Sequence, residues 1–315
     1  MRTPLQGGLP PTGALAGTVL EIACDESGFS GTNLLDPATP VITHASVDLA
    51  PPEAASLIGQ LRSGFRFSPH ELKSGQFLRR PQAGEALDWL LTALAGRAHV
   101  HVIDKEFFLV TRIVDLLLAE PSYAAGTRLS EEHRPAAVAL YRAGHAAAGH
   151  EWAVFLSAFV ELARVKRRHP ADRAIERFLH ARDALGGLPD GLTRERARAL
   201  VARDDAVPPP LEPLLPALAE TVLFWSDATN AGTSAGPRQV LVVHDEQSAL
   251  TADRLTRLGR ALADRSGRSP LAGLVMVDSR DDPRVQVADL LAGVARREPG
   301  VLGRLSTTSL SAGSV

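Results

Sequence analysis

The chain has 315 residues, of which 45% are hydrophobic and 22% are charged, so its composition excludes a disordered or low-complexity protein. The formal net charge of −2 excludes a global positive field that would hold nucleic acid by charge alone. The single cysteine, Cys24, excludes an internal disulfide, and no run of about 18 apolar residues would cross a bilayer. We therefore expect a cytoplasmic protein with no membrane partner.

Five short β-rich runs are predicted to be strands, and amphipathic helical patterns lie between them. In chain order the strands are predicted at residues 18–24, 41–47, 99–103, 239–244 and 271–277. Leucines at helical spacing form stripes before the third and the fifth strand: Leu87, Leu90, Leu91 and Leu94, then Leu255, Leu258 and Leu262. This alternation predicts an α/β fold with at least part of the sheet parallel.

The middle of the chain breaks the alternation. From about residue 107 to residue 225 the sequence offers helical patterns and no convincing strand, and it ends in a proline-rich segment. We interpret residues 107–236 as a helical insertion that packs beside the sheet and forms one wall of a cleft. The α/β domain would then span residues 17–303, between two segments predicted to be flexible, residues 1–16 and 304–315.

Each predicted strand runs directly into an aspartate. In open α/β sheets, residues just beyond the carboxyl ends of parallel strands gather at the ligand-binding edge. Aspartate is also a common turn and helix N-cap residue, so each position has a structural alternative, Asp48 and Asp278 above all. The five positions are Asp25, Asp48, Asp104, Asp245 and Asp278.

Two strand ends carry paired acids. Asp25 and Glu26 are followed two residues later by Gly28, which lets the backbone turn sharply. Asp245 and Glu246 repeat the pair at the end of another strand. Two such pairs predict a site that concentrates negative charge.

Asp289 lies in an otherwise apolar turn of the last predicted helix, on a face that it shares with Gln286 and Gly293. An unpaired carboxylate would be costly to bury there, so a metal ion, another cation or a proton must compensate it. A salt bridge with an arginine such as Arg296, or a solvent-facing position, is the structural alternative.

A polar segment adds Glu71 and Lys73 as further candidates, with a solvated ion pair as the alternative. Lysine is rare in this arginine-rich chain, and arginine cannot replace a compact point charge where a site needs one. His99 and His101 alternate along a strand, but no further ligand at metal-binding spacing joins them, so we assign them no role. The basic segment 164–169 is either a solvated face or a place for phosphate contacts.

Several familiar site motifs are absent from the sequence. It has no GxxxxGK[ST] phosphate loop, no GxGxxG after the first strand, no HExxH and no CxxC. The sequence therefore gives no support to a nucleoside triphosphatase, a dinucleotide enzyme or a zinc site.

The strand ending in DESG, the ELK segment, the strand ending in HDE and the helix with QVADLLAGVARR together resemble the prokaryotic domain-of-unknown-function family numbered 3800. The resemblance spans residues 18–297 and is carried by Asp25-Glu26 and by Gln286 with Asp289. It implies a ribonuclease H-like fold, a mixed sheet flanked by helices, which here would carry the large helical insertion that the pattern predicts. That fold places an Asp on its first strand and another on its last helix around a metal pair.

The resemblance implies a Mg²⁺- or Mn²⁺-dependent nuclease. The catalytic and metal-ligating candidates are Asp25, Glu26, Asp245 and Asp289, with Glu71 and Asp104 in reserve and Lys73 as a support for the phosphate. The low net charge favours a short or structured nucleic acid, or a protein partner that brings it. A non-catalytic recognition module whose helical insertion binds a protein partner, and a small-molecule phosphohydrolase, are the alternatives.

Overall fold

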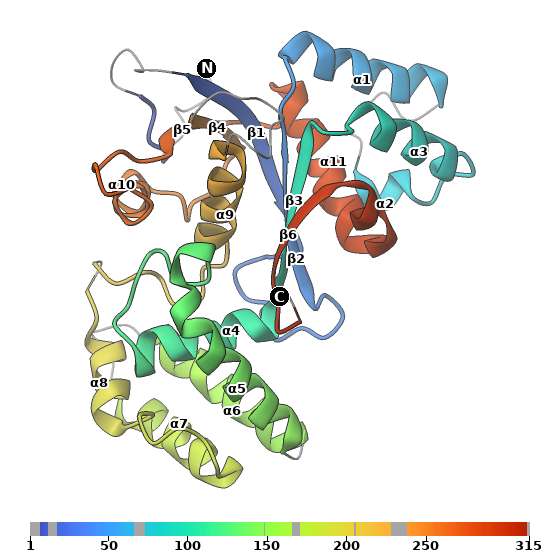
Figure 1. Cartoon of the computed structure of the whole chain (residues 1–315). Helices are drawn as coiled ribbons and strands as arrows, with labels where there is room; N and C mark the ends of the chain where they lie inside the picture. The colour runs from blue at the N-terminus through green and yellow to red at the C-terminus, as the bar shows by residue number, and fades with distance from the viewer. Residues whose placement is uncertain are drawn as a thin grey trace. The chain divides into compact units, whose positions relative to one another are not determined.

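The computed structural model describes residues 7–11, 18–65, 73–147, 149–165, 171–204, 206–227 and 238–313, and the chain divides into two compact units (Figure 1). The sheet unit comprises Met1–Phe29, Val41–Val102 and Ala217–Ser309. The helical unit comprises Ser30–Pro40, Ile103–Pro216 and Leu310–Val315. The helical unit thus contains most of the predicted insertion, but it begins and ends earlier and includes the segment between the first two strands.

A mixed six-stranded sheet forms the centre of the sheet unit, in the order β5-β4-β1-β2-β3-β6. The strands are β1 (Val19–Ser27), β2 (Val41–Val47), β3 (Ala98–Asp104), β4 (Gln239–Asp245), β5 (Leu271–Val277) and β6 (Ser306–Leu310). β1 pairs in parallel with β4, and β4 with β5, whereas β1 and β2 are antiparallel. The α/β class and all five predicted strands are confirmed.

β6 lies in the segment for which the sequence predicts a flexible tail, and for Ser306–Leu310 that prediction is wrong. The run STTSL is short and polar, so it carries little strand signal. It is a strand because it lies at the edge of the sheet, where the Thr308 hydroxyl is 2.9 Å from His99 Nε2 and 2.8 Å from His101 Nδ1.

The predicted flexible N-terminal segment also contains an ordered part. The Gly8 amide donates to the Leu250 carbonyl, and Leu9 forms an isolated antiparallel bridge with Leu274 of β5. The structure therefore corrects the prediction for these residues, whereas residues 1–6 and 12–17 lie outside the described part of the chain.

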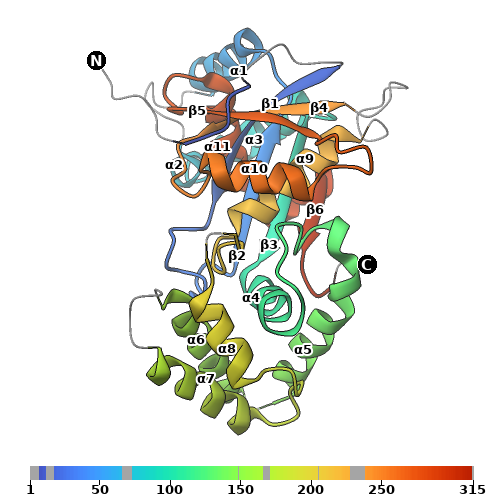
Figure 2. The same cartoon turned by 90° about the vertical axis from the view of Figure 1, so that its left-hand side faces the viewer.

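Different helices cover the two faces of the sheet, and Figures 1 and 2 show α9 and α11 on either side of the strands. Ala23, Ala45 and Val243 share one core with α11 (Pro283–Arg297), α1 (Pro51–Gly64), α2 (Ser74–Phe77) and α3 (Ala83–Ala93). The alternate residues of the strands face α9 (Leu214–Ser226), where His44 Nδ1 lies 2.8 Å from Thr221 Oγ1. We call these the α11 face and the α9 face.

The predicted leucine stripes are buried as expected, except for Leu87, which is half-buried. Leu90, Leu91 and Leu94 are at most 2% exposed in and just after α3. Leu255 and Leu258 are fully buried in α10 (Ala252–Ala261), and Leu262 follows them. A stripe of this kind forms a helix because one apolar face can be removed from water while the opposite face stays solvated.

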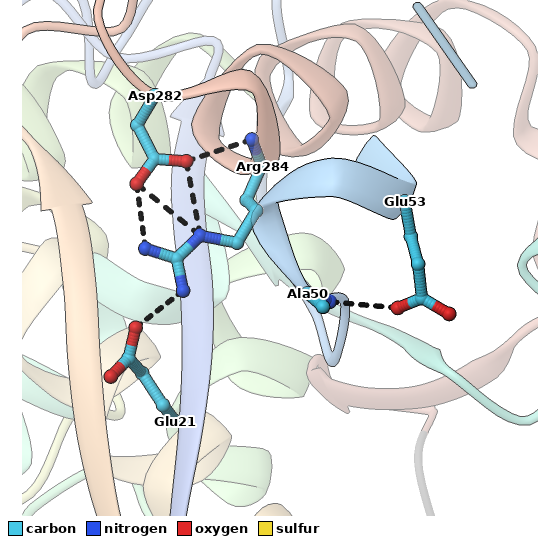
Figure 3. Close-up of polar contacts among 5 residues, drawn as sticks. All are labelled: Glu21, Ala50, Glu53, Asp282 and Arg284. Atoms are coloured by element: carbon cyan, nitrogen blue, oxygen red, sulfur yellow. Dashed lines mark hydrogen bonds and ion pairs between the residues drawn. The ribbon is translucent and has the colours of Figure 1, made fainter. Parts of the chain in front are cut away.

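α11 is fixed to the start of β1 by Arg284 (Figure 3). The Arg284 guanidinium donates to both carboxylate oxygens of Asp282 and to the carboxylate of Glu21 on β1. Asp282 also caps the helix, because its carboxylate accepts from the Arg284 amide. Arg284 and Asp282 are almost buried, with side-chain exposures of 10% and 13%, whereas Glu21 is 46% exposed. Because Asp282 is the N-cap of α11 itself, the buried Arg284–Asp282 pair holds the guanidinium in place, and the bond to Glu21 joins α11 to β1.

The helical unit is built on aromatic packing. Its elements are α4 (Lys105–Ile113), a π-helical turn (Val114–Leu118), a 3-10 helix (Arg128–His133), α5 (Arg134–Ala146), α6 (Gly149–Arg164), α7 (Asp172–Leu185) and α8 (Arg194–Ala202). Phe155 of α6 contacts Phe178 of α7 at 5.5 Å between ring centroids. The described residues between 107 and 213 contain no strand, so the helical character predicted for this region is confirmed. Among all described residues, no helix has the length and apolarity needed to cross a membrane.

Replacing Arg284 by Gln should lower the free energy of unfolding by about 3 kcal/mol, because Asp282 is then left almost buried without its cationic partner. Glu21→Gln should cost less than about 1 kcal/mol, because Glu21 is half exposed. Urea denaturation of the two variants and the parent tests this ranking. Equal losses of stability in both variants would show that burial does not set the relative strength of these two ion pairs.

Candidate functional site

Three predicted site residues come together on the α11 face of the sheet. The register of the parallel pair β1 and β4 places Ala23 beside Val243 and Cys24 beside His244, and Asp25 and Asp245 are the next residues of the two strands. Asp25 and Asp245 are each two residues beyond a core residue, Ala23 and Val243, so they lie on the same face of the sheet as these residues. This face is covered by α11, which carries Asp289. The negative charges of Asp245 and Asp289 both act on Asp25. We call Asp25, Asp245 and Asp289 the aspartate cluster.

Asp25 is the buried member of the cluster, with only 6% of its surface exposed. Burial raises its pKa to about 9, and the charges of Glu26, Asp289 and Asp245 add to this shift. The amide of Glu26 donates to Asp25 Oδ1 at 2.8 Å, which opposes the shift without cancelling it. Asp25 therefore keeps its proton at neutral pH unless another positive charge approaches.

The cluster lies where the connections of the sheet diverge. β1 continues into β2 on one side, whereas β4 and β5 lie on the other side. Open sheets bind ligands at such a point, outside the carboxyl ends of the parallel strands. Asp25 and Glu26 belong to β1 itself, which extends to Ser27, beyond the predicted end at residue 24. The turn that follows uses Gly28, whose φ is 99°.

Glu26 lies on the opposite face from Asp25. It pairs with His44 across β1 and β2, and it accepts a hydrogen bond from Gln247 Nε2. His244 Nε2 is 3.9 Å from Glu26 Oε2 and 3.2 Å from His44 Nε2. The two acids of the predicted pair thus divide between the faces of the sheet, because adjacent strand residues point in opposite directions.

Asp289 has a cationic partner, but it is not the arginine proposed as the structural alternative. Lys73 Nζ donates to Asp289 Oδ2 at 2.9 Å, and the lysine side chain is 52% exposed. Arg296 instead donates from Nε to Ser27 Oγ at 3.0 Å. Lys73, which the sequence suggested as a support for phosphate, is therefore a direct neighbour of the cluster.

A close helix contact holds Lys73 near Asp289. Lys73 immediately precedes α2, and Ser74 packs so closely on α11 that a Cβ at Gly293 would lie 2.0 Å from Ser74 Oγ. Arg297 Nη1 donates to the same hydroxyl at 3.0 Å. Only glycine at position 293 leaves room for this approach, one turn beyond Asp289.

The structure gives the remaining strand-end acids other roles. Asp104 lies in the helical unit, where its carboxylate caps α4 by accepting from the Phe107 amide. Asp278 binds the backbone and side chain of Arg280 just after β5, and Asp48 follows β2, which runs opposite to β1. Glu71 lies outside the described residues.

Sequence reasoning missed the histidines of the α9 face. His44 and His244 are fully buried, and their rings stack at 5.4 Å. Burial lowers the pKa of both, so they are neutral. His99, to which the sequence assigned no role, stacks on Phe224 of α9 at 4.0 Å. The only signal for His244 was its position in HDE beside Asp245, and no local signal marked His44.

Comparisons of the chain with family models, with curated proteins and with solved structures give no match. Among the described residues, no three or more His, Cys, Asp or Glu side chains are arranged so that together they could hold a metal ion. The cluster can take up a proton at Asp25 and a cation beside Asp289, and these two properties define its chemistry.

Replacing Asp25 by Asn should change how stability depends on pH. The folded protein holds this proton up to about pH 9, whereas the unfolded chain releases it near the ordinary aspartate pKa of 3.8. The folded state therefore binds more protons in this window, so stability falls as the pH rises, by up to about 1.4 kcal/mol per pH unit. Asn keeps the shape and removes this slope.

Urea denaturation in EDTA between about pH 5 and pH 9 measures the effect. The variant should gain stability relative to the parent as the pH rises. Asp253→Asn, an exposed change on α10, should follow the parent throughout. A difference between parent and Asp25→Asn that is the same at every pH would contradict the raised pKa of Asp25.

Replacing Gly293 by Ala should separate α2 from α11, because the new methyl group has no room beside Ser74. We expect the free energy of unfolding to fall by about 1–3 kcal/mol, as at other overpacked positions. Adding Ser74→Gly removes both clashing atoms and should recover part of this stability. If the double variant is no more stable than Gly293→Ala, the close approach of Ser74 is not the cause.

Proposed function

We propose that the sheet unit is a divalent-metal-dependent phosphodiesterase of the nuclease class, which binds Mg²⁺ or Mn²⁺ through Asp25, Asp245 and Asp289. The observation that carries the proposal is the burial of Asp25 beside two further aspartates. Such a group is stable only with a proton or a nearby cation, and perturbed carboxylates of this kind gather at functional sites.

The residues fit a hard divalent cation. Carboxylate oxygens are the ligands that Mg²⁺ and Mn²⁺ prefer, and the described cluster offers no thiolate. Mg²⁺ commonly needs only one or two carboxylates, because waters and substrate phosphates complete its shell. A site of this kind therefore does not require three protein ligands arranged in advance. When bound, the metal would activate water and stabilise the charge that develops on a phosphodiester.

The surrounding residues would prepare the site for such an ion. Two adjacent strands hold Asp25 and Asp245, so their positions are fixed before any ligand arrives. Lys73 occupies the place of a cation beside Asp289, and its half-exposed side chain could turn to a substrate phosphate when a metal takes that place. Glu26 adds negative potential at Asp25 from the other face of the sheet.

The resemblance to the domain-of-unknown-function family 3800 and its ribonuclease H-like fold supports this proposal. The mixed sheet flanked by helices, an Asp on the first strand and an Asp on the last helix agree with what that fold implies. We propose that the protein's substrate is a short or structured nucleic acid, or that a protein partner bound by the helical unit brings the nucleic acid.

The Lys73–Asp289 ion pair favours a second candidate, in which the acids are structural and the protein is a non-catalytic recognition module. In that case the lysine is the permanent partner of Asp289. A small-molecule phosphohydrolase would use the same aspartates as a nuclease and differs only in its substrate.

Replacing Asp289 by Asn should separate these candidates. Without metal the variant should be as stable as the parent or more so, because one of several repelling charges is gone. A metal that binds only the folded state adds about 2.7 kcal/mol at a hundredfold excess over its Kd, and the variant should lack most of this stabilisation. Thermal unfolding of both proteins, each with EDTA and with millimolar Mn²⁺, measures the two effects.

Asp253→Asn is the matched control, since it makes the same chemical change on α10 and should keep the full Mn²⁺ effect. If Asp289 is only the partner of Lys73, Asn should destabilise the protein equally in EDTA and in Mn²⁺. A parent whose melting temperature does not respond to Mn²⁺ would also remove the metal site.

A further inference from the structure

Three arginines gather at the C-terminal end of α11, near the start of α2. Arg296 and Arg297 are the last residues of α11, and Arg79 follows α2. Arg79 and Arg297 line one pocket together with Gly75, Leu78 and Glu298. We call Arg79, Arg296 and Arg297 the arginine cluster.

Neutral oxygens hold these arginines in place. Arg296 Nε donates to Ser27 Oγ, Arg297 Nη1 donates to Ser74 Oγ, and Arg79 Nε donates to the Gly75 carbonyl at 2.7 Å. In the described part of the chain no carboxylate lies within 4.0 Å of their guanidinium nitrogens, although Glu298 lies on the wall of the pocket. Arg97 and Arg284, in the same unit, are each paired with an acid.

The positive charges of Arg296 and Arg297 are close enough to repel each other. Burial and the charge of Arg297 lower the pKa of Arg296. The side chain of Arg296 also packs against the turn after β1, where a Cβ at Gly28 would lie 2.7 Å from Arg296 Cδ. The negative end of the helix dipole favours positive charge here, but it does not require three arginines held by neutral groups. An anion would relieve the repulsion.

The arginine cluster and the aspartate cluster lie along the same helix. Arg296 follows Asp289 by seven residues, which is two helical turns, so both lie on one side of α11 at a separation of about 10 Å along its axis. Ser27, which accepts the hydrogen bond from Arg296, lies two residues beyond Asp25 on the same face of β1, so the two clusters are also neighbours along this strand. A ligand that runs along α11 could therefore reach both clusters.

We propose that the arginine cluster binds a second phosphate of the substrate, so that the substrate is a single-stranded nucleic acid of several nucleotides. The proposal rests on the proposed function, because it takes the aspartate cluster as the place of the scissile phosphate. One phosphate group cannot contact two clusters that are two helical turns apart on α11, so the ligand must carry at least two phosphates. A mononucleotide with a single phosphate cannot place one phosphate in each cluster.

Guanidinium chemistry suits this role. Arginine binds phosphate through paired donors, and each side chain of the cluster has nitrogens beyond those bonded to its neutral partner. The chain has a net charge of −2, so attraction to a polyanion must come from a local patch of this kind. The basic segment 164–169, for which the sequence left a solvated face and phosphate contacts as alternatives, is in the helical unit and is described only up to residue 165.

Binding of a fluorescently labelled single-stranded oligonucleotide of about twelve residues, in EDTA to prevent cleavage, tests the subsite. Arg296→Gln combined with Arg297→Gln should weaken binding about tenfold, whatever the base sequence. The slope of log affinity against log salt should become shallower by about 0.7 for every phosphate that the variant no longer neutralises. Replacing both arginines by Lys keeps the charges and should restore the slope.

The control is Arg260→Gln combined with Arg265→Gln, which removes two exposed arginines of the same unit and should leave binding unchanged. Failure of the parent to bind the oligonucleotide, or equal affinity and slope for parent and Arg296/Arg297 variant, would overturn the subsite. Thermal unfolding of the same variant with Mn²⁺ separates the two proposals. A retained Mn²⁺ effect with unchanged oligonucleotide binding rejects the subsite alone, whereas arginine-dependent binding without any Mn²⁺ effect supports the subsite and rejects the metal site.

Discussion

Electrostatic repulsion among Asp25, Asp245 and Asp289 is the constraint on which the rest of the site depends. The sheet holds two of these carboxylates on neighbouring strands and α11 brings the third, in a place where Asp25 has little contact with water. Like charges in such surroundings require compensation. A proton on Asp25 and the ammonium group of Lys73 beside Asp289 provide it in the structure, and both are positive charges that a divalent cation could replace.

Residues along the whole length of α11 contact or approach the aspartate cluster's face of the sheet. At its start, Arg284 joins Asp282 and Glu21 and fixes α11 to β1. In its middle, Asp289 faces the strand aspartates, and Gly293 admits Ser74 so that Lys73 reaches the cluster. At its end, Arg296 and Arg297 provide positive charge. The negative and positive side chains along α11 thus have a spacing that a rigid element sets.

The α9 face of the sheet carries neutral polar groups next to the aspartate cluster. Buried histidines lie there beneath α9, and burial keeps His44 and His244 neutral. Together with Gln247 they surround Glu26 without providing a full positive charge. Glu26 therefore adds to the negative potential around Asp25 instead of neutralising it. The two adjacent acids therefore have different surroundings. Asp25 lies on the α11 face with the other aspartates, and Glu26 lies on the α9 face with the histidines.

The sequence by itself determined the parts of this protein that depend on local pattern. Alternating apolar residues identified five strands, leucine spacing identified helices, and Asp289 stood out because a carboxylate is costly in an apolar turn. The proximity of Asp25 and Asp245 could be proposed from strand ends, and it follows from parallel pairing of β1 with β4. Tertiary structure decided what no local pattern contains. It gave Asp104 a capping role, divided Asp25 and Glu26 between two faces, made STTSL an edge strand, and paired Asp289 with Lys73 because Gly293 admits a second helix. Contacts between residues distant in the chain depend on register and close packing, and these exist only once the elements have assembled.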